Sequence, residues 1–216
     1  VDQAGLSLDN GQHILLGAYR DTLQLMAWVG LDSTQALCRL PLTLQTLQGQ
    51  GLALPALPYP LNVLLGITTA KGWRWRDKAK LLDQALRWQA QGFACEPHQS
   101  VDILCQSLPP KVIDQMIEPL CVSALNLPMA QASGQVFLRV MKDALSLGKG
   151  SSDFLLPKVD LSQLMPDATQ RWLQAQGATV LTHSRVNQLD ELGTGPVLLA
   201  CPAWEAARLL SPIHPA

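Results

Sequence analysis

The chain has 216 residues, of which 48% are hydrophobic and 15% charged, so its composition suits a large buried core. Its 16 basic and 17 acidic side chains leave a net charge of −1, which excludes a general nucleic-acid binder because such proteins carry a basic excess. The 5 cysteines form no CxxC pair and the 4 histidines share no i,i+4 spacing, so no metal site is expected. With no targeting features in the sequence, we expect reduced, buried thiols and a cytoplasmic protein.

The first third of the chain is expected to combine a strand, a helix and a hairpin. Residues 6–9 are typical of a short strand that runs into an Asn-Gly turn, and residues 19–30 of a helix that ends at a glycine. Apolar and polar residues alternate on both sides of a glycine pair in residues 42–54, which predicts a hairpin. Residues 55–60 hold three prolines and therefore form a loop.

The middle of the chain is expected to be mainly helical. Residues 76–92 give the clearest amphipathic pattern, with Ala79, Leu82 and Leu86 on the buried face. Further helices are expected over residues 101–108, 111–126 and 134–148, the last with Ser133 as its N-cap, and a short strand over residues 154–157.

The last part of the chain has a different pattern of expected secondary structure. A helix over residues 166–176, a strand over 178–182, a strand over 195–202 and a helix over 203–210 follow one another at α/β spacing. The fold class is therefore predicted to be mixed α+β. A mainly helical region with a small sheet would be followed by strands and helices that belong to an incomplete α/β domain.

One polar stretch stands out near the start, in "DNGQH" at residues 9–13. Gly11 permits a close approach of the backbone to a flat ligand, and Asn10, Gln12 and His13 can hydrogen-bond to heteroatoms. The alternative interpretation is a polar turn that closes a strand. The sequence holds no G-x-S-x-G motif, and its glycine clusters lack the strand–loop–helix setting of a phosphate-binding loop.

A family resemblance rests on four blocks that occur in family order. They are "LDNGQHILLGAYRDTLQLM", "EPLCVSALNLPMAQASGQVFLRVMKDAL", "SDFLLPKVDLSQLMPDATQRWLQAQGATVLTHSRV" and "VLLACPAWEAARLL". Together they resemble the squalene-associated FAD-dependent desaturases, or hydroxysqualene dehydroxylases, of the flavin amine oxidase and phytoene desaturase superfamily. The chain departs from this family in lacking the G-x-G-x-x-G fingerprint, which would precede Val1, and in a short link before residue 195.

The resemblance implies that the chain is the central part of an FAD-dependent oxidoreductase. Residues 1–30 would lie at the edge of the flavin domain, residues 31–156 would form the substrate-binding domain, and residues 157–216 would be part of the α/β FAD domain. The implied reaction is reductive dehydroxylation of hydroxysqualene to squalene. FAD would be the cofactor of the full-length protein, and this chain alone is expected to be inactive.

The same resemblance assigns roles to the turn. Gly11, Gln12 and His13 would face the isoalloxazine ring or the reacting carbon, while Asp9 and Asn10 would set the turn. His13 would protonate the leaving hydroxyl group, because a pKa in the neutral range suits a general acid at physiological pH.

Two further segments are expected to contact an isoprenoid lipid substrate and a membrane. Residues 40–70 hold no charged residue, so we expect them to line an apolar cavity that includes Leu64 and Leu65, the alternative being ordinary core. Residues 71–80 carry five basic side chains against one acid. There, Trp73, Arg74, Trp75 and Arg76 are expected to contact a membrane surface, as a peripheral protein on the inner membrane would. The alternative is a solvated helix start with both tryptophans packed on the core.

Other functional classes stay open at this point. The apolar interior also suits a non-catalytic lipid-binding or interaction domain, which would need no flavin. A carotenoid-type desaturase fits the same resemblance. A relative that oxidises polar amines is disfavoured by the lack of charge between residues 40 and 70.

Overall fold

The protein is described here by a computed structural model, which covers residues 2–3, 6–7, 9, 11 and 13–212. The chain is a mixed α+β protein with small antiparallel sheets, as the sequence predicts. It divides into two units, residues 1–172 and 173–216, and the division falls within the helix Pro166–Ala175. Each unit is described by itself.

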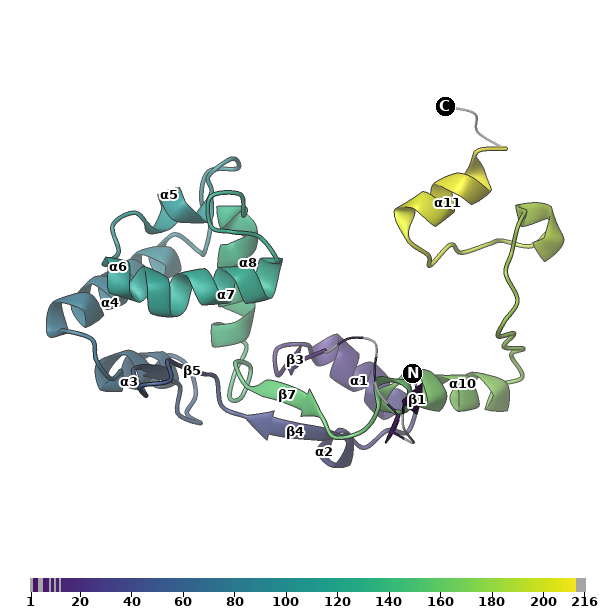
Figure 1. Cartoon of the computed structure of the whole chain (residues 1–216), viewed down its shortest axis with the longest axis horizontal. Helices are drawn as coiled ribbons and strands as arrows, with labels where there is room; N and C mark the ends of the chain where they lie inside the picture. The colour runs from purple at the N-terminus through teal and green to yellow at the C-terminus, as the bar shows by residue number, and fades with distance from the viewer. Residues whose placement is uncertain (1, 4–5, 8, 10, 12, 213–216) are drawn as a thin grey trace. The chain divides into compact units, whose positions relative to one another are not determined.

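The strands of the first unit are short, and its helices make up most of the residues between them (Figure 1). The strands are β1 (Asp2–Gln3), β2 (Leu6–Ser7), β3 (Leu15–Leu16), β4 (Leu37–Leu40), β5 (Thr43–Gln45), β6 (Gly51–Ala53) and β7 (Phe154–Pro157). The helices are α1 (Arg20–Trp28), α2 (Ser33–Ala36), α3 (Leu61–Thr69), α4 (Trp75–Ala90), α5 (Val101–Cys105), α6 (Pro110–Val112), a π-helical turn (Ile113–Ile117), α7 (Glu118–Leu125), α8 (Gly134–Ser146), α9 (Leu161–Leu164) and α10 (Pro166–Ala175).

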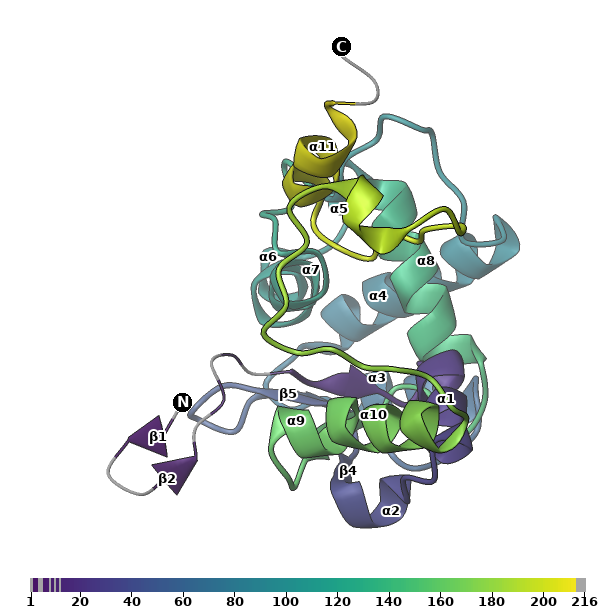
Figure 2. The same ribbon diagram turned by 90° about the vertical axis from the view of Figure 1, so that its right-hand side faces the viewer.

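Strand β7 organises the first unit because it pairs on both of its edges. It runs antiparallel to β3, with Leu15 opposite Leu155, and antiparallel to β4, with Leu40 opposite Phe154. Segments that are more than 100 residues apart in the sequence thereby meet in one sheet. The predicted hairpin is confirmed as β5–β6, with Thr43 opposite Ala53, while β1 and β2 form a small hairpin that stands off from the sheet (Figure 2).

The first unit has two hydrophobic cores. The larger one fills the space among α3, α4, α5, α7 and α8, where Phe137 and Leu138 of α8 are fully buried. The smaller one lies where α1, α2 and α9 cover the sheet, around Met26 and Leu155. Figure 1 shows the helical part at one end of β4 and β7 and the smaller cluster at the other. The two strands therefore connect the cores.

Helix α4 is confirmed, but its predicted buried face is only partly right. Leu82 is half-buried against the larger core, whereas Ala79 and Leu86 are exposed. The buried residues are Lys78, Leu81 and Trp88. Trp88 packs edge-on against the ring of Phe137 with ring centroids 6.4 Å apart. The large indole of Trp88 buries more apolar surface than an alanine would, and the ammonium of Lys78 bonds a backbone carbonyl. Tertiary packing, and not the spacing of aliphatic residues, therefore decides which face of α4 is buried.

The thiols are free, as expected, but their burial varies. Cys105 and Cys121 are buried, whereas Cys38, Cys95 and Cys201 are half-buried. Burial raises the pKa of the Cys105 thiol to about 12, with a smaller contribution from the neighbouring Cys121. Because the thiolate is the nucleophile, Cys105 is inert near neutral pH and serves as core.

The second unit lacks the two strands expected at residues 178–182 and 195–202: its described residues, 173–212, contain the end of α10, a 3-10 turn (Leu189–Leu192) and α11 (Ala203–Leu210). A strand needs a partner for its backbone N–H and C=O groups, and neither segment pairs with another within these residues. The apolar side chains of Leu181 and Leu198 are consequently exposed, by 75% and 92%.

An ion-pair cluster holds the second unit together. Arg208 of α11 bonds the Glu205 carboxylate at 2.7 Å and also donates to the carbonyl oxygens of Val186 and Asn187. Arg185 approaches the same carboxylate at 3.2 Å. Hydrogen bonding from Arg208 holds the pKa of Glu205 below its usual range. The cluster ties residues 185–187 to α11.

A close backbone approach beside β7 fixes the loop that precedes it. Gly17 donates its N–H to the carbonyl of Asp153 at 2.9 Å, and a Cβ at Gly17 would lie 1.9 Å from the Gly150 carbonyl oxygen. The Arg39 guanidinium donates to that carbonyl and to the Asp153 carboxylate, at 3.0 Å each. Any side chain at position 17 would push this loop away from the sheet.

We therefore expect Gly17→Ala to destabilise the first unit by about 1–3 kcal/mol, the range for overpacking a tight contact. Urea unfolding followed by tryptophan fluorescence measures the difference. The matched control is Gly11→Ala, since the nearest atom to a methyl group there is Nε2 of His13, at 4.0 Å. Equal unfolding midpoints for the two variants would contradict the role of the Gly17–Gly150 contact.

Candidate functional site

A cavity of the first unit has a volume of about 320 Å³ and a mostly apolar wall. It lies between the helical core and the sheet, and five structural pieces enclose it. These are the segment around β3 (Ile14, Leu16, Ala18, Tyr19), the β5–β6 hairpin (Leu42, Leu52, Leu54), α3 (Val63, Ile67), the π-helical turn with α7 (Met116, Leu120, Ser123, Ala124), and α8 with the start of β7 (Val140, Met141, Asp143, Ala144, Leu145, Ser152, Phe154). Its size falls at the lower end of the range for small-molecule sites.

Five residues of the segment 40–70 line the cavity, but Leu64 and Leu65 are not among them. Four of the five, Leu42, Leu52, Leu54 and Ile67, also belong to the larger core, so the segment serves as core and as cavity wall. Both are exposed, by 45% and 44%, on the outer face of α3. Val63 and Ile67 point the other way, into the cavity wall. A helix turns by about 100° per residue, so the pattern that identified the segment could not show which face turned inward.

The π-helical turn Ile113–Ile117 is a feature that the sequence interpretation missed. It places Met116 in the cavity wall, and it precedes Pro119 within the helix that continues as α7. Proline has no N–H to donate to the carbonyl four residues earlier, so the helix is locally widened before it. The signal that could have revealed this turn was the Glu118-Pro119 pair inside an otherwise regular helical pattern.

Few polar side chains line the cavity, and they differ in what they bond. The Ser123 hydroxyl donates to the Leu120 carbonyl at 3.2 Å, and the Asp143 carboxylate accepts from Arg139 at 2.7 Å. Ser152 is only 5% exposed and lines the cavity, so its hydroxyl can hydrogen-bond a polar group of a ligand there.

The neighbouring serine has a structural role. The Ser151 hydroxyl donates to the carbonyls of Ala144 and Gly148, at 2.7 and 2.9 Å. Together with the contact between Gly17 and Gly150, these bonds fix the loop from which Ser152 faces the cavity wall.

The turn that the resemblance assigned to the flavin lies next to the cavity in the sequence. Gly11 and His13 are exposed, and Ile14, the next residue, lines the cavity. Gln12 lies outside the residues that the structure describes. The open space around Gly11 fits a planar ring placed against the backbone, because only His13 approaches it, at 4.0 Å.

Asp9 anchors this turn to a distant helix. Its carboxylate accepts the backbone N–H of Leu161, at 3.1 and 3.2 Å to the two oxygens, where α9 begins. The pairing of β3 with β7 fixes the other side of the turn. Asp9 therefore does more than shape its own turn, since it is tied to the helix that covers the smaller core.

The four residues predicted to contact a membrane do not share one environment. Trp73 is 6% exposed and its indole N–H donates to the Gln115 side chain at 2.8 Å, so its assignment to a membrane contact is wrong. Arg74, Trp75 and Arg76 are exposed, Trp75 by 72%. Trp73 lies just before α4 and is buried, whereas Trp75 is the first residue of α4 and is exposed.

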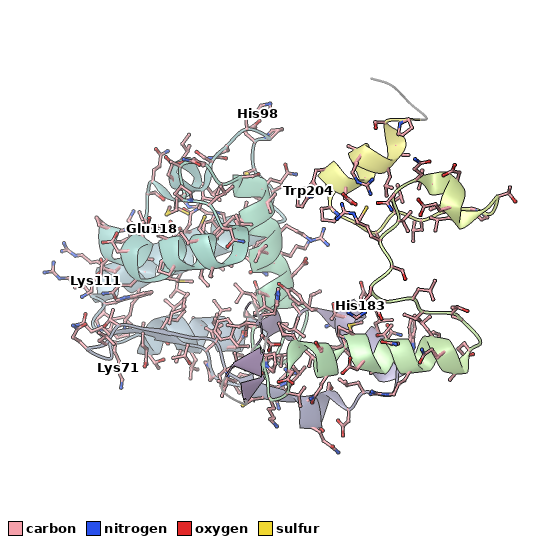
Figure 3. The ribbon with its side chains drawn as sticks, turned by 45° about the vertical axis from the view of Figure 1, so that its right-hand side comes forward. Lys71, His98, Lys111, Glu118, His183 and Trp204 are labelled. Atoms are coloured by element: carbon pink, nitrogen blue, oxygen red, sulfur yellow. The ribbon has the colours of Figure 1, made fainter. Side chains whose placement is uncertain are left out.

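Outside the cavity, the described residues offer little to a metal or a nucleophilic mechanism. His98 projects outward from the loop before α5, and His183 lies in the second unit, as Figure 3 shows. No group of three or more His, Cys, Asp or Glu side chains that could hold a metal ion occurs in the described part of the chain. Among the helices of those same residues, none combines the length and the apolar character needed to cross a bilayer.

Comparison with known proteins assigns no family. No family model matches the chain, and no curated protein matches it.

Proposed function

We propose that this chain is part of an FAD-dependent oxidoreductase that acts on a long apolar isoprenoid, with reductive dehydroxylation of hydroxysqualene to squalene as the specific reaction. The observation that carries the proposal is the apolar cavity of about 320 Å³. Hydrocarbon side chains from five separate segments form most of its wall, which suits a ligand without charge. The four family-like sequence blocks supply the flavin part of the proposal.

Ser152 supports a substrate that carries one hydroxyl group. Its hydroxyl lies in a mostly apolar wall, where it can hydrogen-bond the oxygen of a ligand that is otherwise apolar. An alcohol offers that oxygen, and a pure hydrocarbon does not.

The turn at residues 9–14 supplies the remaining roles. FAD would provide the hydride for the reaction when it is bound. The backbone at Gly11 would lie against the flat ring system, and Gln12 keeps the cofactor-binding role that the resemblance gives it. His13 would donate a proton to the hydroxyl group of the substrate, which leaves as water. Exposed on a turn beside Ile14, His13 has access to solvent for taking up the next proton.

The cavity is tested first by closing its opening. Ala124 is exposed and lines the cavity, so Ala124→Trp is expected to raise the Kd for n-decane roughly tenfold, by filling the opening. Displacement of the neutral dye Nile red measures the affinity. Val122→Trp is the matched control, because Val122 is exposed on the same helix and does not line the cavity. Absence of decane binding to the unmodified chain would exclude the cavity as the substrate site.

The hydroxyl contact is tested by comparing an alcohol with an alkane of equal length. Ser152→Ala should raise the Kd for 1-decanol about fivefold, the effect of one hydrogen bond, and leave that for n-decane unchanged. Ser151→Ala serves as the control, since its hydroxyl bonds only backbone carbonyls and its loss should lower stability without altering the ratio of the two affinities. An equal change for both ligands in the Ser152 variant would refute the contact.

The proton-donor role predicts a kinetic effect. In the full-length protein supplied with reduced FAD and hydroxysqualene, His13→Ala should lower turnover roughly 10²–10⁴-fold, as loss of a general acid does. The Kd for n-decane should not change. His98→Ala is the control, because His98 is exposed on a loop away from the cavity. Undiminished turnover in the His13 variant would remove this residue from the mechanism, and a full-length protein that binds decanol without any turnover would favour a lipid-binding module.

A further inference from the structure

Helix α3 has two apolar faces, and only one of them is covered. Val63 and Ile67 face the cavity, whereas Leu61, Leu64 and Leu65 are exposed by 49%, 45% and 44%. The spacing of these three leucines places them on one side of the helix. A run of large apolar side chains on the outside of a helix marks an interaction surface more often than a scattered exposed residue does.

Contacts at the end of α3 bring an exposed tryptophan next to this face. Thr68 lies on the leucine side, since its hydroxyl donates to the carbonyls of Leu64 and Leu65 at 2.8 and 3.1 Å. The Lys78 ammonium donates to the Thr68 carbonyl at 2.7 Å and lies 4.8 Å from the ring centroid of Trp75. The indole of Trp75 is thereby held at the end of the leucine row.

Basic side chains border the same region. Lys71, Arg74, Arg76 and Lys80 are all exposed where α3 passes into α4, and Figure 3 shows Lys71 projecting from the outer end of the helical part. The nearby acid, Asp77, caps α4, because its carboxylate accepts the Arg74 N–H at 3.0 Å, and it keeps its negative charge. Four exposed cations against this one acid leave the border positive.

We infer that the α3–α4 surface, made of Leu61, Leu64, Leu65 and Trp75 with the basic residues Lys71, Arg74 and Arg76, binds to an anionic lipid bilayer. Exposed leucines would enter the boundary of the acyl chains, the indole would lie at the headgroup level, and the cations would pair with anionic headgroups. This surface differs from the one expected from the sequence, because it excludes Trp73 and includes the leucines of α3.

Charge decides between a membrane and a second copy of the chain. A two-fold dimer on this surface would place the same patch on both subunits, so the basic border of one would face the basic border of the other. Like charges held in that way repel each other. An anionic bilayer complements the border instead.

The position of α3 gives this surface a role in delivering substrate. One face of the helix would rest on lipid while the other forms the wall of the cavity, so an insoluble ligand need not cross bulk water. This role rests on the proposed function, but binding to lipid does not. A chain that binds vesicles and fails to bind decane would retain the surface and lose the cavity.

The experiment is co-sedimentation of the chain with two kinds of vesicle. One kind is phosphatidylcholine alone, and the other contains about 30% phosphatidylserine, which makes its surface strongly anionic. We expect binding to the anionic vesicles that weakens as salt is raised. Leu64→Asp/Leu65→Asp should lower the partition coefficient roughly tenfold or more, because it removes the apolar contact. Arg76→Gln should lower it about fivefold at low salt.

Leu86→Asp and Arg171→Gln are the matched controls, as both residues are exposed and lie elsewhere on the chain, in α4 and α10. Circular dichroism checks that each variant is folded, and Trp75→Ala, at a position 72% exposed, replaces the double variant should that one fail to fold. Equal sedimentation of the surface variants and the controls would overturn the proposal. So would a concentration-dependent dimer that the double aspartate variant abolishes while lipid binding persists.

Discussion

The antiparallel pairing of β7 with both β3 and β4 is the constraint on which the rest of the first unit depends. It brings together residues 15–16, 37–40 and 154–157, which have no local reason to meet. Once they are paired, the segment that follows β4 becomes the hairpin wall of the cavity, and the segment before β7 carries Ser152. The two hydrophobic cores lie on either end of these strands and are each completed by helices that the sheet positions.

The sheet in turn depends on a contact that only glycine allows. Gly17 comes so close to the Gly150 carbonyl that a Cβ would overlap it, and Arg39 also bonds that carbonyl. Because the loop cannot move outward, Ser152 stays buried in the cavity wall. Backbone packing at the surface of the sheet thereby places one of the polar side chains that line the cavity.

Helix α3 links the two proposals. Five of its nine residues are large and apolar, and they fall on two sides of the helix: Val63 and Ile67 face the cavity, and three leucines face outward. A helix that only completed a core would carry polar residues on its outer face. The proposed contact with lipid would account for this second apolar side.

The sequence by itself determined the local elements. Glycine and proline positions marked the ends of α1 and the loop before α3, Ser133 capped α8 through the Val136 N–H, and alternation around Gly49 predicted the β5–β6 hairpin. These features depend on neighbours within a few residues, where chain stereochemistry acts alone. The sequence also identified residues 40–70 as a source of the cavity wall, since a segment without charge is unsuited to a solvated surface.

Only the tertiary structure decided which side of each element is covered. Leu64 and Leu65 look like core residues in the sequence and are exposed, whereas Trp73 looks interfacial and is buried against Gln115. The segments at residues 178–182 and 195–202 have the composition of strands but acquire no partner among the described residues. Burial and strand pairing are set by contacts with distant parts of the chain, and an apolar residue meets its packing requirement equally well in a core, in a cavity wall or against lipid.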